Sequence, residues 1–195
     1  MIDRRRILTL TLAAGLGRAT FSPTSAETSS APGISRITAY GFSFAALDGK
    51  DIRLSDFAGR PMLIVNTASL CGYTPQYAGL QQLWTEFQPQ GLMMIAVPSN
   101  DFGGQEPGGA SDIDQTAHAQ YGVTFPITAK AVVRGPNAHP FYRWAAAERP
   151  KAVPAWNFHK YLLGRDGHIT DAFASAVEPT DTRIKTAIGR ALSAA

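Results

Sequence analysis

The sequence has very little cysteine: Cys71 is the only one among 195 residues. A lone thiol cannot form a disulfide within its own chain. Dithiol exchange of the Cys-x-x-Cys type is also excluded, because Thr74 stands where the second cysteine of such a pair would be. Any redox chemistry at Cys71 therefore needs a partner from outside the chain.

Other absences narrow the function further. No apolar run is long enough to suggest a membrane span. No basic block with interleaved aromatic residues supports nucleic-acid binding, although the formal net charge is +3. The histidines lack metal-ligand spacing, so we interpret all of them as structural or exposed and expect no cofactor. They are His118, His139, His159 and His168.

The N-terminus has the features of a targeting segment. Arg4, Arg5 and Arg6 precede a short apolar stretch over residues 7–17. This pattern resembles a twin-arginine export signal. We therefore predict a signal peptide and linker over residues 1–32, a periplasmic or exported location, and one domain over residues 36–195. An amphipathic or disordered tail is the alternative interpretation.

The remaining pattern predicts an α/β fold. Apolar runs at residues 61–67 and 92–97 indicate buried strands, and the helical spacing of apolar residues over 76–88 predicts a helix between them. Such an alternation implies a parallel pair with a right-handed crossover. Hairpins are expected over 38–54, with a strand at 38–45, and over 157–173. A short strand is expected within 124–133, and further helices over 111–121, over 139–148 and after 181.

These elements together fit a thioredoxin-like architecture. We expect a mixed central sheet with helices on both faces and an N-terminal β-hairpin. Cys71 would lie between the first buried strand and the following helix, near the positive end of the helix dipole, where a thiolate is favoured. An inert buried thiol is the alternative at this position.

A thiolate that attacks a peroxide needs donors for the leaving oxygen, and neutral amide and indole N–H groups are suited to this. Gln105 lies in a Gly- and Pro-rich loop beyond the second buried strand, and Trp156 and Asn157 precede a later strand. Each has a simpler alternative role: Gln105 as a loop cap, Trp156 as a core aromatic, and Asn157 as a turn residue.

Three ordered segments resemble signatures of the glutathione peroxidase family. They read Asn-Thr-Ala-Ser-Leu-Cys-Gly-Tyr-Thr-Pro-Gln-Tyr over 66–77, Pro-Ser-Asn-Asp-Phe-Gly-Gly-Gln-Glu-Pro-Gly over 98–108, and Trp-Asn-Phe-His-Lys-Tyr-Leu over 156–162. The resemblance implies a thioredoxin-like fold and reduction of hydroperoxides. It assigns Cys71 as the peroxidatic nucleophile and Gln105, Trp156 and Asn157 as the donors that polarise it and receive the leaving oxygen.

The chain differs from many members of that family at positions that affect how an oxidised Cys71 would be reduced again. Ala117 and Ser99 stand where thiol-dependent members often carry further cysteines. The resemblance therefore implies that glutathione, another small thiol or a thiol protein resolves the oxidised Cys71. Asp101 replaces a usual glutamine, and we expect its carboxylate to point away from the thiol. The segment between Pro140 and Trp156 is short, which resembles monomeric members that accept lipid hydroperoxides.

Two other functions remain open from the sequence. The same Cys71 chemistry would serve a peroxide sensor or redox relay that passes oxidation to a partner protein. A non-catalytic binding protein could also keep the scaffold, although nothing structural requires glutamine, tryptophan and asparagine together.

Overall fold

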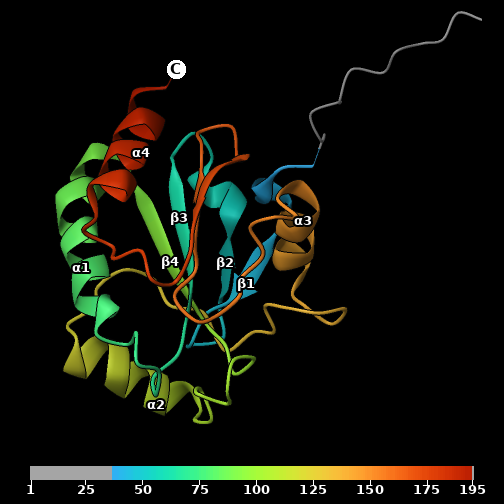
Figure 1. Ribbon diagram of the computed structural model, residues 1–195, viewed down its shortest axis with the longest axis vertical. Coiled ribbons are helices and arrows are strands. Elements are labelled where there is room, and N and C mark those ends of the chain that lie inside the picture. The colour runs from blue at the N-terminus through green and yellow to red at the C-terminus, as the bar shows by residue number, and fades with distance from the viewer. Residues whose placement is uncertain (1–36, 195) are drawn as a thin grey trace, which may run out of the picture. The chain divides into compact units, whose positions relative to one another are not determined.

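The computed structural model describes residues 37–194. Its centre is a four-stranded mixed sheet in the order β4-β3-β5-β6 (Figure 1). Strand β3 (Met62–Thr67) is parallel to β4 (Met93–Pro98) and antiparallel to β5 (Lys160–Leu163). Strand β6 (Ile169–Phe173) completes the edge by pairing antiparallel with β5. The parallel pair and the C-terminal hairpin confirm the predicted topology.

A smaller antiparallel sheet pairs β1 (Ser43–Ala45) with β2 (Asp51–Arg53). Gly49, with φ of 79°, lies in the turn between them. The predicted strand over 38–45 is only partly correct. Its first half is the 3₁₀ turn η1 (Ala39–Gly41), because the Ala39 N–H donates to the Gly167 carbonyl instead of joining a ladder.

Helices cover both faces of the central sheet. Figure 1 shows α1 (Gln76–Phe87) and α4 (Thr182–Ser193) together on one side and α3 (Pro140–Glu148) on the other. The short helix α2 (Ala110–Asp114) continues directly into a π-helical segment, η4 (Gln115–Gln120). Two 3₁₀ turns, η2 (Leu54–Phe57) and η3 (Gln88–Gln90), precede β3 and β4. Among residues 37–194, no helix is long and apolar enough to cross a membrane.

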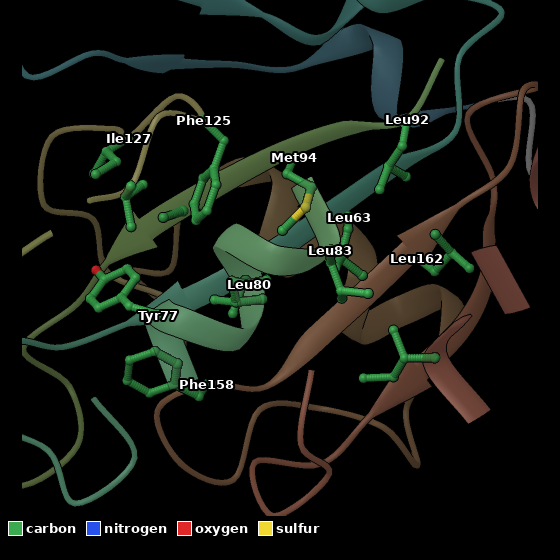
Figure 2. Close-up of a cluster of buried hydrophobic side chains, with 14 of the residues drawn as sticks. Leu63, Tyr77, Leu80, Leu83, Leu92, Met94, Phe125, Ile127, Phe158 and Leu162 are labelled. Carbon is green, nitrogen blue, oxygen red and sulfur yellow. The ribbon is translucent and has the colours of Figure 1, made fainter. Parts of the chain in front are cut away.

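Each face of the sheet has its own hydrophobic core. Leu63 and Val65 of β3 face α1 and α4, whereas Met62 and Ile64 face α3, since successive strand side chains alternate. Figure 2 shows the first core, where Leu80 and Leu83 of α1 lie over the sheet. The strands are buried on both faces, which explains why β3 and β4 read as continuous apolar runs.

Two predicted strand segments are shorter in the structure. Strand β5 begins at Lys160 and not at residue 157, because Phe158 has a left-handed backbone with φ of 63°. Within 124–133 the predicted strand is reduced to isolated bridges, which join Thr128 to Ala46 and Ile127 to Ala96. The first difference lies next to Trp156 and Asn157, two of the predicted site residues.

Candidate active site

Cys71 lies in a tight turn between the end of β3 and the start of α1. It is 6% exposed and belongs to the core beneath α1. Its Sγ atom accepts a hydrogen bond from the Tyr73 backbone N–H at 3.4 Å. The thiol is therefore buried and has a backbone donor directed at it, which stabilises negative charge on sulfur.

Thr74 closes the turn that holds Cys71. Its hydroxyl accepts the Cys71 backbone N–H at 3.0 Å, and it donates toward the carbonyls of Ala68 at 2.8 Å and Cys71 at 2.7 Å. Thr74 is itself buried. The residue that excludes a Cys-x-x-Cys pair thus fixes the backbone of Cys71.

Two of the predicted donors, Gln105 and Asn157, are in direct contact. The Asn157 Nδ2 group donates to the Gln105 Oε1 at 3.1 Å. This bond fixes the orientation of the Gln105 amide and leaves its NH₂ group facing away from Asn157. The backbone carbonyl of Gln105 accepts the backbone N–H of Leu70, the residue before Cys71, at 3.0 Å. The glutamine loop is thereby tied to the cysteine turn.

The third predicted donor, Trp156, lies against the same loop. A Cβ atom placed on Gly103 would be 3.5 Å from both the Trp156 Cη2 and the Gln105 Cγ, an ordinary contact distance, so the indole packs against this turn, where the φ of 66° favours glycine. The Trp156 ring also packs against Phe102, with centroids 5.8 Å apart. Trp156 remains 40% exposed. An exposed indole at this position can meet an incoming substrate.

The structure thus brings Gln105, Trp156 and Asn157 together and ties the Gln105 loop to the cysteine turn. Within residues 37–194, the Cys71 Sγ makes no hydrogen bond to any of the three donor side chains. Catalytic hydrogen bonds are often loose without substrate and tighten in the complex. The arrangement leaves the Gln105 NH₂ and the Trp156 N–H free to donate.

Asn66 holds the segment that carries two of the donors. Its Nδ2 group donates to the Trp156 carbonyl at 3.1 Å. Its backbone carbonyl accepts the Phe158 N–H at 2.5 Å, and its backbone N–H donates to the His159 carbonyl at 3.2 Å. These three bonds hold Phe158 in its left-handed conformation, which costs about 1–3 kcal/mol. Sequence analysis placed Asn66 in a motif but gave it no role.

Glu106 was also missed as a site residue. It is fully buried, and its Oε2 accepts the Ser69 backbone N–H at 2.9 Å and the Ser69 hydroxyl at 3.1 Å. Burial raises the pKa of the carboxyl, the dominant effect over its bonds to Ser69. The Lys130 ammonium binds the carbonyls of Glu106 and Gly108, at 2.9 and 2.8 Å, and so holds this loop in place.

The positions where the chain departs from the resembled family have clear structural roles. The Asp101 carboxylate accepts the backbone N–H groups of Val133 at 2.6 Å and Arg134 at 3.2 Å, so it is engaged by that loop. Ser99 is fully buried, and its hydroxyl accepts the Asp101 N–H at 3.3 Å. Ala117 is fully buried in the core beneath α1.

Comparison with solved structures defines the class of fold. The crystal structure of Trgpx in apo form matches with a TM-score of 0.67 at 31% identity, covering 82% of this chain and 98% of that one. A thioredoxin-family thiol:disulfide interchange protein from Chlorobium tepidum TLS matches at a TM-score of 0.58 and 14% identity, covering 78% and 93%. The protein has the predicted thioredoxin-like fold.

Comparison with known sequences then defines the family. Residues 39–146 match the glutathione peroxidase family model. The hydroperoxy fatty acid reductase gpx1 of Synechocystis is 45% identical over 153 residues, which cover 74% of this chain and 90% of that protein. The chain belongs to the glutathione peroxidase family, as the three sequence motifs indicated.

Proposed function

We propose that the protein is a thiol-dependent peroxidase that reduces hydrogen peroxide or organic hydroperoxides through Cys71. The observation that carries this proposal is the contact between Asn157 and Gln105, on a loop bonded to the neighbour of Cys71. It holds a neutral amide on a loop whose backbone is bonded to the residue that precedes Cys71. Membership of the glutathione peroxidase family supports the same chemistry, which uses a thiol as the reductant.

The proposed oxidation is a displacement at oxygen. The Cys71 thiolate attacks the terminal oxygen of R–O–O–H, forming an S–O bond while the O–O bond breaks. The leaving alkoxide takes a proton and departs as R–OH, and the sulfur, now oxidised by two electrons, is a sulfenic acid. The amide of Gln105 and the indole of Trp156 would stabilise charge on the leaving oxygen, and Asn157 would hold the Gln105 amide in place.

Regeneration of Cys71 would require two molecules of an external thiol. The first condenses with the sulfenic acid, releases water and leaves a mixed disulfide. The second attacks that disulfide, restores the Cys71 thiol and leaves as the oxidised disulfide of the reductant. No cofactor is needed for this sequence of steps. A small thiol such as glutathione is the reductant we propose, because neither Ser99 nor Ala117 can resolve Cys71.

Steady-state assays on single variants test this function. We expect the wild-type protein to consume a hydroperoxide when given a reducing thiol, and Cys71→Ser to lose turnover. Trp156→Ala and Asn157→Ala should retain Cys71 but react more slowly, while Ser99→Ala should turn over normally because its hydroxyl contacts only the Asp101 backbone. Full turnover by Cys71→Ser would contradict the proposal.

A peroxide sensor or redox relay is the second candidate function. The absence of a second cysteine in the sequence favours it, because oxidised Cys71 must then react with a thiol from another molecule. A relay would oxidise Cys71 stoichiometrically, turn over slowly with small thiols, and form a mixed disulfide with a partner protein. Trapping such a disulfide from cells, together with slow turnover on every small thiol, would favour the relay over the peroxidase.

We also propose that the protein is exported. The support is the sequence alone, since residues 1–32 lie outside the described residues. In a host with a twin-arginine pathway, the double variant Arg4→Lys, Arg5→Lys should stay in the cytoplasm as the precursor. The unaltered chain should reach the periplasm. Equal periplasmic yields of the two would contradict this route.

A further inference from the structure

Glu106 is the only fully buried acidic side chain among residues 37–194. Burial of a carboxyl group is unfavourable unless hydrogen bonds replace its contacts with water. One of its oxygens, Oε2, is hydrogen-bonded within the described part of the chain, whereas Oε1 has no partner there. An apolar residue of similar size would cost less free energy at such a position. The carboxyl group of Glu106 therefore calls for an explanation other than stability.

The hydrogen bonds of the Glu106 side chain are made to the segment that leads into Cys71. The Glu106 Oε2 accepts the Ser69 backbone N–H at 2.9 Å and the Ser69 hydroxyl at 3.1 Å. The backbone carbonyl of Gln105 accepts the Leu70 backbone N–H at 3.0 Å. Two consecutive residues of the Gln105 loop thus hold the two consecutive residues before Cys71. These three bonds fix the cysteine turn relative to the residue that carries the Gln105 amide.

Side-chain packing contributes little to the position of this segment. Leu70 is 67% exposed, Ser69 is half-buried and Gly72 is exposed. A cavity of about 480 Å³ lies beside the segment, and its lining includes Ser69, Leu70 and Glu106. The segment would therefore have space to move into if its hydrogen bonds were lost. Its position depends on the bonds from residues 105 and 106 more than on contacts in the core.

The backbone of Glu106 is itself anchored on both sides. Its N–H donates to the Asn100 Oδ1 at 2.8 Å, and Asn100 lies two residues beyond the end of β4. Its carbonyl accepts the Lys130 ammonium at 2.9 Å, and the same ammonium donates to the Gly108 carbonyl at 2.8 Å. The Glu106 side chain therefore holds Ser69 from a fixed point that is tied to the end of a core strand.

We propose that Glu106 is a positioning residue for the oxidation of Cys71: through Ser69, it holds the thiol where the attacked peroxide leaves its second oxygen at the Gln105 amide. The inference rests on the proposed peroxidase function and adds a residue to it. Glu106 acts through Ser69 and not on the peroxide, because its side chain is fully buried. Without this bond the cysteine turn could shift, and the thiolate would attack with no donor aligned to the leaving oxygen.

Two neutral replacements of similar size isolate the role of the hydrogen-bond acceptor. Glu106→Gln keeps an oxygen that can accept from Ser69, whereas Glu106→Met keeps the volume without such an oxygen. We expect the rate constant for Cys71 oxidation by hydrogen peroxide to fall about 10²-fold in Glu106→Met, as misplacement of reacting groups can produce, and less than about threefold in Glu106→Gln. An unchanged rate in Glu106→Met would contradict the positioning role. Equal losses in the two variants would also contradict it, because they would assign the effect to the charge.

Alkylation of Cys71 by iodoacetamide separates positioning from general damage to the site. This reaction needs the thiolate but no amide donor, so we expect its rate to change less than about threefold in Glu106→Met. A parallel fall in alkylation and oxidation would contradict the proposal. Glu86→Ala is the matched control, since it also removes a carboxylate that accepts a hydrogen bond, from Lys185 at 2.6 Å, but at an exposed position on α1. Both rates should stay at the wild-type value in this control.

A double-mutant cycle tests whether Glu106 acts by aligning Cys71 with Gln105. Gln105→Ala should slow oxidation strongly in the wild-type background but less than about threefold in Glu106→Met, where the amide is no longer aligned. Equal factors in the two backgrounds would show that the residues act independently and would overturn the proposal.

Ser69→Ala provides a milder variant in case Glu106→Met does not fold. Ser69 is half-buried, and the change removes its hydroxyl bond to Glu106 while the backbone bond stays. Loss of one hydrogen bond corresponds to a rate about fivefold lower, with alkylation by iodoacetamide unaffected. Oxidation at the wild-type rate in Ser69→Ala would count against a hold exerted through this residue.

The same measurements keep this inference distinct from the proposed function. If hydrogen peroxide oxidises Cys71 equally fast in wild-type protein and in Glu106→Met, only the role of Glu106 is wrong. If Cys71 of the wild-type protein is alkylated by iodoacetamide but is not oxidised by any peroxide, the peroxidase function is wrong, and the positioning role fails with it.

Discussion

At the scale of single residues, the candidate site relies on neutral donors and on precise orientation of one amide. The Gln105 side chain is oriented by Asn157 and its main chain by Leu70. The nearest acidic groups are engaged elsewhere: Glu106 binds Ser69, and Asp101 binds the 133–134 backbone. The Asp101 carboxylate and the Glu106 Oε2 are thus held by other groups, and the developing negative charge on the leaving oxygen would meet the N–H donors.

Replacing Gln105 with alanine tests the donor directly. Loss of one donor to a developing oxyanion typically lowers a rate about 10²–10³-fold, and we expect an effect of that order on the oxidation of Cys71 by hydrogen peroxide. Stopped-flow measurement of thiol loss in a single turnover isolates this step. Gln120→Ala, an exposed position on η4, is the control. An unchanged oxidation rate in Gln105→Ala would remove this residue from the mechanism.

His159 gives the protein a defined dependence of stability on pH. Burial is the largest cause that lowers the pKa of its imidazole, from 6.5 to about 4, and the neighbouring Lys160 charge adds to the effect. Between these values the unfolded chain binds the proton and the folded chain does not, so stability falls as the pH drops through this range. The loss attributable to His159 is about 3 kcal/mol.

Denaturant unfolding at several pH values between 4 and 6.5 measures this effect. His159→Phe keeps a ring against Tyr161, whose centroid lies 4.7 Å away, and should flatten most of the slope. A residual slope is expected from His139, whose pKa is also lowered by burial. Gln120→Phe, at an exposed position on η4, introduces the same ring without removing a titratable group and should retain the wild-type profile. If the unfolding free energy of His159→Phe fell with pH as steeply as that of the wild type, the assignment of this pH dependence to His159 would be wrong.

At the scale of elements, strand β3 positions the site through its last residues. Asn66 is buried at the end of this strand and binds the 156–159 segment through both its side chain and its backbone. The strand therefore carries the cysteine turn at its end and also holds the segment with two of the donors. Movement of either part relative to the other would have to break these bonds.

Asn66→Ala should loosen that segment without removing any proposed donor. The Trp156 carbonyl that would lose its partner is only partly buried, so we expect a loss of unfolding free energy of about 1 kcal/mol, at the low end of the cost for a buried group. We also expect the maximal rate of peroxide reduction to fall with little change in the KM for the thiol, which a general loss of stability would not produce. Asn137→Ala, at an exposed loop position, should match wild type in both measurements. A KM-only effect in Asn66→Ala would contradict a positioning role.

Elements dominated by local patterns were predictable from the sequence. The apolar runs gave β3 and β4 within a residue or two, and the spacing of Tyr77, Leu80 and Leu83 predicted α1. The start of β5 was not predictable, since it depends on Asn66, far away in the chain. The complete burial of Lys160 also depends on distant partners, Gln76 and Val177, which no local pattern indicates.

The candidate site could also be predicted in part, because its residues lie in local sequence motifs. The motifs identified Cys71, Gln105, Trp156 and Asn157, and the structure brings the three donors together. It does not test their roles in the reaction, which stay predictions. Thr74 and Glu106 were missed as site residues because their partners are backbone groups of the cysteine turn, visible only once that turn is folded.

At the scale of the whole molecule, one chain cannot complete the proposed catalytic cycle, because it has no second thiol to reduce oxidised Cys71. Cys71 is the only thiol, is 6% exposed and lies in the core beneath α1. We expect the protein to be a monomer, in keeping with its short 140–156 segment. Sedimentation should give the mass of one chain before and after addition of peroxide, because a buried sulfenic acid is poorly placed to meet the Cys71 of a second copy. A stable dimer before oxidation would contradict this expectation.

Mass spectrometry of Cys71 after one equivalent of peroxide tests the central claim most directly. We predict that the Cys71 peptide gains one oxygen atom, is captured by a sulfenic-acid reagent, and returns to the thiol when a reducing thiol is added. The added thiol should appear as a mixed disulfide at Cys71 before full recovery. Consumption of the peroxide with an unmodified Cys71 peptide throughout would contradict the claim that this thiol is the peroxidatic nucleophile.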